Sequence, residues 1–142
     1  MDGSERVIKH LEITQGVINR LAHNSFLIKG WSMTILAAAI LFLARVDNIN
    51  SVYLTLSFII PVIGFWILDG YFLWQERLFR GIYNDIRNQE DTDFKMDIPA
   101  QLKKPKNQWS NATLSVTLII FYLTELSFLG LVAYILSCNQ YT

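Results

Sequence analysis

The chain has 142 residues, the length of one typical domain. Hydrophobic residues make up 52% of it and charged residues only 17%, against roughly 45–50% and about 25% in soluble domains. Twelve basic and twelve acidic residues cancel, so the net charge indicates no polyanionic partner. A single cysteine, Cys138, excludes an intramolecular disulfide and a cysteine-rich zinc site. This composition favours a membrane protein.

Three long apolar stretches predict three transmembrane helices. Each approaches or exceeds the roughly 20 residues needed to cross a hydrocarbon core about 30 Å thick, and none shows the polar face of a soluble amphipathic helix. The predicted spans are residues 26–44, 52–74 and 112–138. Pro61 should kink the second span, because proline leaves the carbonyl of Ser57 without its helical partner.

The distribution of lysine and arginine predicts the orientation of these spans. Four basic residues lie at or before Lys29, one in the connection after the first span, seven in residues 75–111 and none after Cys138. Short cytoplasmic segments carry the excess of basic residues in membrane proteins. The N-terminus and residues 75–111 are therefore predicted to be cytoplasmic, with the C-terminus on the opposite side.

The cytoplasmic segments are predicted to be mainly helical. Residues 5–25 form an amphipathic helix that runs without a breaker into the first span. Residues 75–111 form a helix and then a loop, because Pro99 and Pro105 prevent a continuous helix. We therefore predict an all-α fold, a polytopic membrane protein with three transmembrane helices, an N-terminal amphipathic helix and a helical cytoplasmic connection. The whole chain, residues 1–142, is predicted to be one membrane domain.

An apolar seam with heptad spacing runs along one face of the N-terminal helix. Its main members are Val7, Leu11, Ile18 and Leu21. Two interpretations remain open for this seam. It is either a surface for self-association around a symmetry axis, or it packs on the helix predicted from Gln75 to Gln89 of the same subunit.

Charged and hydroxylated residues within the spans are the strongest functional candidates. Glu125 lies at the midpoint of the third span, where a carboxylate costs about 2.5 kcal/mol or more unless it faces protein, water or a partner. It borders a stripe of polar residues on one side of that helix, comprising Ser110, Thr113, Thr117, Thr124 and Ser127. The stripe either hydrogen-bonds to neighbouring helices or lines a water-filled path. Asp69, in the second span, is predicted to pair with Lys29 at a similar depth.

A basic cluster just before the third span is a second candidate. Lys103, Lys104 and Lys106 are close in sequence, and Arg80 and Arg87 share a face of the preceding helix. One interpretation is that the lysines contact anionic lipid headgroups. The other is that an oligomer repeats these charges around a ring and binds a phosphate-rich ligand.

The sequence carries no signature of an enzyme. It has no glycine-rich phosphate loop, nucleophile elbow or metalloprotease helix. His10 and His23 cannot form a metal centre without help from carboxylates. We expect no catalytic activity, cofactor or metal, and a transporter or intramembrane enzyme would require Asp69 and Glu125 to converge.

Three segments carry a resemblance to a known family: HLEITQGVINRLAHNSFLIKGW (10–31), FWILDGYFLWQERLFRGIYNDIR (65–87) and FKMDI (94–98). In them the chain resembles small bacterial membrane proteins encoded beside nucleotidyltransferases in anti-phage defence loci, the channel-forming effectors of the Hailong system. The third span resembles them only in general character. The resemblance implies an oligomeric ion channel of the bacterial inner membrane, a tetramer held closed by a single-stranded DNA oligomer that the partner nucleotidyltransferase makes. Loss of the oligomer during infection would open the channel and depolarise the cell.

Two functions from different classes are therefore expected. The first is a homo-oligomeric ion channel acting as a defence effector, with the bilayer, other copies of the chain and a single-stranded DNA oligomer as partners. Its N-terminus would lie in the cytoplasm and its C-terminus in the periplasm. The second is a non-conducting membrane anchor or regulatory subunit that recruits a cytoplasmic partner. No ligand-binding residue is transferred from the family to this chain.

Overall fold

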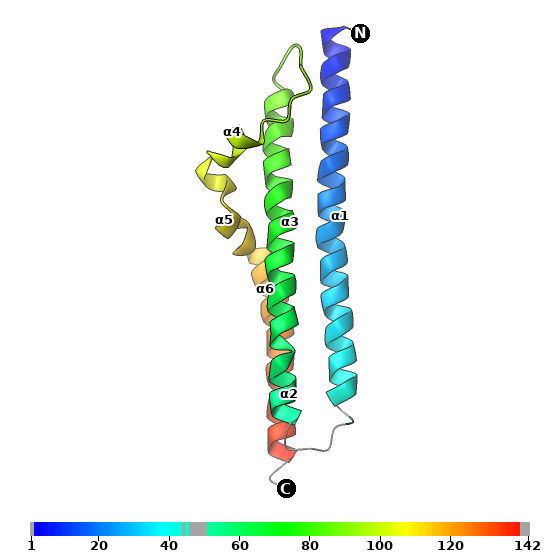
Figure 1. Ribbon diagram of the computed structural model, residues 1–142, viewed down its shortest axis with the longest axis vertical. Helices are drawn as coiled ribbons and strands as arrows, with labels where there is room; N and C mark the ends of the chain where they lie inside the picture. Colours follow the sequence, from blue (N-terminus) through cyan, green and yellow to red (C-terminus); the bar gives the residue numbers. More distant parts are fainter. Residues whose placement is uncertain (1, 44, 46–50, 140–142) are drawn as a thin grey trace. The chain divides into compact units, whose positions relative to one another are not determined.

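The computed structural model describes residues 2–43, 45 and 51–139, and the side chains of Ser51, Val52, Lys106 and Asn139 lie outside the described part. Its helices follow in the order α1 (Gly3–Leu43), α2 (Ser51–Ser57), α3 (Ile59–Ile86), α4 (Ile98–Leu102), the 3-10 helix η1 (Pro105–Asn107), α5 (Trp109–Thr113) and α6 (Val116–Asn139) (Figure 1). Among the described residues, three helical segments are long and apolar enough to cross a membrane. The predicted all-α fold with three membrane helices is confirmed.

Helix α1 joins the predicted amphipathic helix and the first predicted span in one uninterrupted element. The first proline of the chain is Pro61, so nothing in this part of the sequence removes a helical hydrogen bond. The helix ends at Leu43, and Ala44, the last residue of the predicted span, lies outside the described residues.

The second predicted span is interrupted close to Pro61, the residue at which a kink was predicted. Helix α2 ends at Ser57 and α3 begins at Ile59, two residues before Pro61. Pro61 has no N–H group to donate to the carbonyl of Ser57. At the break, the Phe58 N–H donates to the Thr55 carbonyl at 3.1 Å in a tighter turn.

The third span begins later than predicted, and this corrects the predicted start at residue 112. Residues 109–113 form the separate helix α5, and Leu114 leaves helical geometry with φ −92° and ψ 22°. The carbonyl of Ser115 then accepts the first hydrogen bond of α6, from the Ile119 N–H at 3.0 Å. Ser110 and Thr113 are therefore not on the helix that carries Glu125.

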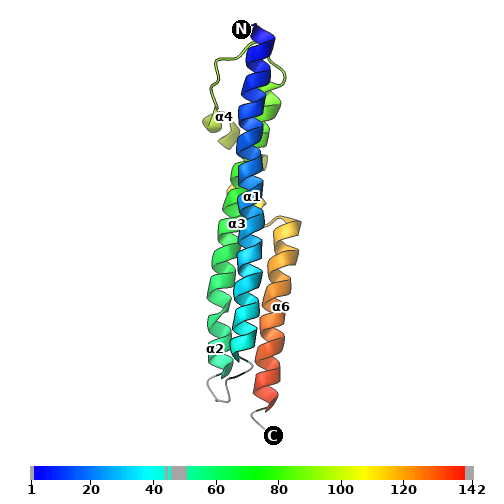
Figure 2. The same cartoon turned by 90° about the vertical axis from the view of Figure 1, so that its right-hand side faces the viewer.

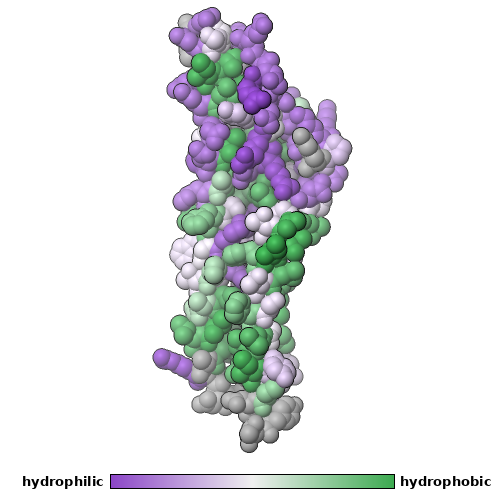
Figure 3. Space-filling model, turned by 180° about the vertical axis from the view of Figure 1, so that it is seen from behind, coloured by the Kyte–Doolittle hydropathy of each residue, from purple (hydrophilic) through white to green (hydrophobic). Residues whose placement is uncertain are grey.

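The chain divides into two compact units. Unit 1 comprises residues 1–26 and 70–114, and unit 2 comprises residues 27–69 and 115–142. Hydrophobic residues dominate the surface of unit 2 in Figure 3, including many large exposed side chains, as expected for helices in lipid. Within unit 2, α2 packs on α6.

The core of unit 1 is where the apolar seam packs. Val7 of α1 is buried in one cluster with Ile82 and Ile86 of α3, and Leu11 packs against that cluster. Ile18 is also buried by the chain itself, and Leu21 is half-buried. Of the two interpretations of the seam, these contacts favour packing within the subunit.

The segment after α3 returns along that helix and is fixed by polar contacts. Gly81 allows the approach, because a Cβ atom there would collide with the side chain of Gln101. Gln101 Nε2 donates to Asp85, and its carbonyl accepts from Asn107 Nδ2 at 3.0 Å. Trp74 Nε1 donates to the Asn107 carbonyl at 2.7 Å. These bonds hold α4 and η1 against α3.

Candidate intramembrane polar site

A buried polar cluster lies among the apolar helices of unit 2. Lys29 and Ser32 come from α1, Asp69 from α3, and Tyr122 and Glu125 from α6. In α1 and in α6 the two polar residues are three positions apart, so each pair lies on one face of its helix. Asp69 is 0% exposed and Glu125 only 4%. Three helices thus bring together residues that are far apart in the sequence, and the bonded pair Ser32 and Glu125 is 93 positions apart.

An ion pair forms one half of this cluster. Lys29 Nζ lies 2.5 Å from Asp69 Oδ2, which confirms the predicted pairing. Tyr122 donates its hydroxyl to the same carboxylate oxygen at 3.1 Å. A buried ion pair of this kind is tolerated only where further hydrogen bonds satisfy its members. Tyr122 supplies one of these bonds.

Glu125 forms the other half of the cluster. Ser32 Oγ donates to Glu125 Oε2 at 2.6 Å, so the carboxylate links α6 to α1 within one chain. Glu125 Oε1 is buried and has no hydrogen-bond partner in the part of the chain that the structure describes. The carboxylate therefore faces protein, as its cost in lipid predicts. The cluster contains two carboxyl groups and one lysine.

A groove of about 730 Å³ lies between α1 and α6, and Glu125 and Lys29 are its charged lining residues. The rest of its wall is almost wholly apolar and includes Met33, Phe121 and Phe128. Sites of roughly 300–1,000 Å³ with apolar walls and a few polar groups are typical of small-molecule binding. Figure 2 shows α1 and α6 running along each other in unit 2.

The hydroxyl stripe of α6 is shorter than predicted. Thr117, Thr124 and Ser127 are on the helix and exposed. Thr124 Oγ1 donates to the Ile120 carbonyl and Ser127 Oγ to the Leu123 carbonyl, both at 2.7 Å. Thr124 and Ser127 are therefore satisfied by their own helix, and in the described part of the chain they make no bond to another helix. Lipid, water or another subunit can contact the stripe.

The predicted basic cluster lies in unit 1, where carboxylates of the same chain pair with part of it. Arg80 Nη2 lies 2.7 Å from Glu76 Oε1, and Lys104 Nζ lies 3.2 Å from Asp85 Oδ2. Lys103 and Arg87 are exposed. These pairs reduce the net positive charge that the sequence predicts for this surface.

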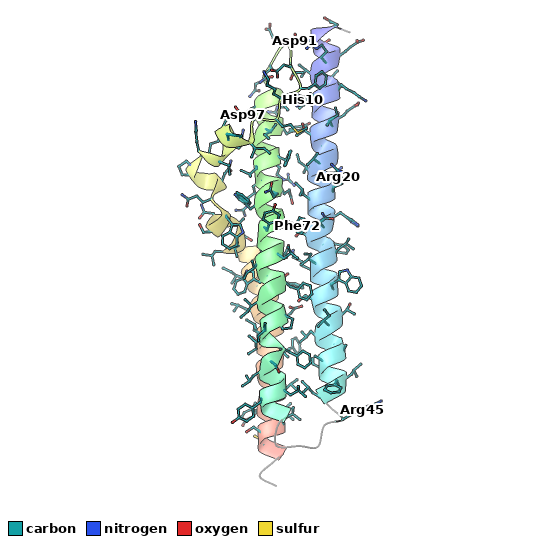
Figure 4. The ribbon with its side chains drawn as sticks, in the orientation of Figure 1. His10, Arg20, Arg45, Phe72, Asp91 and Asp97 are labelled. Carbon is teal, nitrogen blue, oxygen red and sulfur yellow. The ribbon has the colours of Figure 1, made fainter. Side chains whose placement is uncertain are left out.

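A buried histidine site in unit 1 is one that sequence reasoning missed. His10 Nδ1 lies 2.7 Å from Thr92 Oγ1, and the His10 ring lies 5.4 Å from that of Phe94. Figure 4 labels His10 on α1 and Asp91 in the segment after α3. Arg6 bonds to Asp91 and to the Thr92 carbonyl, and Phe94 has a φ of 60°. No spacing rule links residues 82 positions apart, so the sequence offered no signal.

The buried His10 is expected to make the stability of the protein depend on pH. Burial lowers the pKa of His10 below its ordinary 6.5, although Asp93 acts in the opposite direction. The unfolded chain therefore binds the His10 proton more readily, and stability rises with pH where His10 titrates. We expect the thermal stability of the protein in detergent to fall between about pH 7 and about pH 5. His10→Gln should flatten part of that fall.

His23→Gln is the matched control, because His23 is exposed on the same helix. It should leave the pH dependence as in the wild type. An equal fall in the His10→Gln and wild-type proteins would show that the buried histidine does not contribute.

Comparisons with protein-family models, with curated proteins and with solved structures find no match to this chain. Fold and site define a class only: an all-helical protein with three membrane-type helices and a polar cluster buried among them. Among the described residues, no group of three or more histidine, cysteine or acidic side chains is placed to hold a metal ion.

Proposed function

We propose that the chain is the subunit of a homo-oligomeric ion channel in the bacterial inner membrane, with its N-terminus in the cytoplasm and its C-terminus in the periplasm. The exposed stripe of Thr117, Thr124 and Ser127 on α6 carries this proposal. Among the described residues, the hydroxyls of Thr124 and Ser127 bond only to carbonyls of their own helix, and most of that helix is apolar. Repeated around a ring of copies, such a stripe supports a water-filled path.

The orientation is supported by the distribution of basic residues, with seven in residues 75–111 and none after Cys138. The proposed biological role, depolarisation of the inner membrane in anti-phage defence, is supported by the resemblance to Hailong effectors. The same resemblance supports a nucleotide or single-stranded DNA oligomer as the gating ligand and a tetramer as the assembly.

The channel proposal is tested by conductance of the purified protein in planar bilayers. We expect discrete current steps from the wild type. Thr117→Val, Thr124→Val and Ser127→Ala together should reduce the unitary conductance, because they remove the hydroxyls while nearly preserving side-chain volume. Ile135→Val changes another exposed residue of α6 and serves as control. A monodisperse oligomer without current would overturn the proposal.

The alternative is a non-conducting anchor or regulatory subunit that recruits a cytoplasmic partner. Large apolar side chains on the N-terminal part of α1, Ile8 and Ile13, are exposed and favour it. An anchor would leave the membrane potential unchanged on expression. It would also lose its partner in a pull-down when Ile8 and Ile13 are replaced by glutamate.

The gating ligand is tested on the basic cluster. We expect Lys103→Glu/Lys104→Glu/Lys106→Glu to weaken binding of a short single-stranded DNA several-fold in an anisotropy titration, and wild-type binding to fall steeply with salt. The slope against log salt should decrease by about 0.7 for each phosphate that the variant no longer neutralises. Lys104→Glu additionally leaves Asp85 beside a second carboxylate.

Single variants provide the matched comparison. Lys103→Glu should weaken DNA binding more than Lys95→Glu, which makes the same charge change at another exposed site of unit 1, where Lys95 pairs with Asp93. Unchanged affinity in the triple variant would assign these lysines to lipid headgroups.

A further inference from the structure

The charge balance of the intramembrane cluster is the starting point. Lys29 is held by Asp69 at 2.5 Å, and Tyr122 donates a further hydrogen bond to the same carboxylate. Glu125 therefore stands outside this pair, with Ser32 as its hydrogen-bond donor. Serine supplies a hydrogen bond but no charge. A buried carboxylate in apolar surroundings requires either a proton or a cation.

The second oxygen of Glu125 has a defined environment. Ser32 holds Oε2, while Oε1 is buried without a partner among the described residues. Glu125 also lines the groove between α1 and α6. A carboxylate residue that lines an otherwise apolar groove is the arrangement expected for attracting one positively charged group on an otherwise apolar ligand.

The walls of the groove suit an apolar body beside that polar group. Met33 and Leu36 line it from α1, and Phe121 and Phe128 line it from α6. Aromatic faces attract cations as well as apolar groups. The volume of about 730 Å³ falls in the range of small-molecule sites.

We propose that this groove binds an amphipathic monocation, an apolar molecule with one ammonium or phosphonium group, with Glu125 as its counter-ion. Proton and cation exclude each other at this carboxylate, so binding releases the proton where Glu125 holds one. The other titratable groups of the cluster are Lys29 on α1, Asp69 on α3 and Tyr122 on α6. The proposal stands on unit 2 of a single chain. Thr117 and Thr124 of the proposed channel stripe line the same groove, but the binding test below does not require conductance.

Two other occupants fit the groove less well. A lipid acyl chain fills the apolar wall but brings no positive charge to Glu125. The apolar helices of a second copy bring few cations. The basic residues of unit 2 in the described part are Lys29 and Arg45. Lys29 is paired with Asp69, and Arg45 lies beyond the end of α1. Of these three occupants, the monocation brings a positive charge to Glu125.

The test is equilibrium binding of radiolabelled tetraphenylphosphonium to the full chain in detergent. We expect Glu125→Gln to weaken binding about tenfold or more, since it removes the charge and nearly preserves the shape. Glu125→Asp keeps the charge and should retain part of the affinity. Glu76→Gln is the matched control, because Glu76 is a buried glutamate of unit 1 that pairs with Arg80, and it should bind the probe as the wild type does.

The pH dependence supplies an independent readout. Wild-type affinity should rise with pH, and binding in weak buffer should release protons, whereas Glu125→Gln should show neither effect. Size-exclusion chromatography and circular dichroism check that each variant is folded. Equal affinity in folded Glu125→Gln and wild-type proteins would overturn the proposal and assign the groove to lipid chains.

Discussion

Replacement of Asp69 by leucine is expected to destabilise the protein by about 3–5 kcal/mol, because it leaves the ammonium group of Lys29 without its partner in an apolar environment. Asp69 is 0% exposed, and it accepts hydrogen bonds from both Lys29 and Tyr122. The Lys29 side chain is partly exposed, so it can extend towards the membrane interface. Because Lys29 can move in this way, the loss of stability is expected near the lower end of that range, about 3 kcal/mol.

The double variant Lys29→Met/Asp69→Leu provides the control. Replacing both members of a buried ion pair by apolar residues is often nearly neutral, so the double variant should recover most of the lost stability. Unfolding free energies of the wild type, Lys29→Met, Asp69→Leu and the double variant in one detergent form a double-mutant cycle that gives the coupling between the two residues. If the double variant is as unstable as Asp69→Leu, the pair contributes nothing and the defect is one of packing.

Replacement of Ile82 by alanine is expected to destabilise unit 1 by about 2–5 kcal/mol, the usual cost of truncating a buried isoleucine. Ile82 is 3% exposed and forms one cluster with Val7 and Ile86. Ile8→Ala is the matched control, since Ile8 is 58% exposed and should change stability by only about 0.5 kcal/mol. Chemical denaturation followed by circular dichroism measures both.

Ile82→Ala also tests which surface the apolar seam covers. If Val7 and Leu11 pack on α3 of their own chain, the variant should lower hydrogen-exchange protection around residues 7–11 while the oligomeric state persists. Protection that is unchanged in the variant would place the seam between copies of the chain and restore self-association as its role.

The membrane helices and their main ion pair were predictable because both depend on local properties of the sequence. Hydrophobicity summed over about 20 residues identifies a span without any knowledge of its neighbours. Lys29 and Asp69 are single charges at matching depths of adjacent spans, so the penalty for leaving either alone predicts their pairing. The break before Pro61 follows from the chemistry of one residue.

The start of α6 was not predictable in the same way. Residues 110–117 are rich in serine and threonine, which fit a helix interior, a cap or a turn equally well. In the structure the chain leaves helical geometry at Leu114 and α6 begins at Val116, and this separates Thr113 from Thr117. The predicted polar stripe was too long because it assumed one continuous helix from Ser110 to Ser127. The spacing of polar residues does not reveal the turn at Leu114.

By itself the sequence determined which segments are apolar helices, where a helix breaks at proline and which two charges pair, since these follow from composition and spacing along the chain. Only the tertiary structure decided that Ser32 bonds to Glu125, that His10 bonds to Thr92 and that the seam of Val7 and Leu11 packs on α3. The physical reason is that a single hydrogen bond between distant residues leaves no periodic trace. Such a contact arises only when helix packing brings the two side chains together.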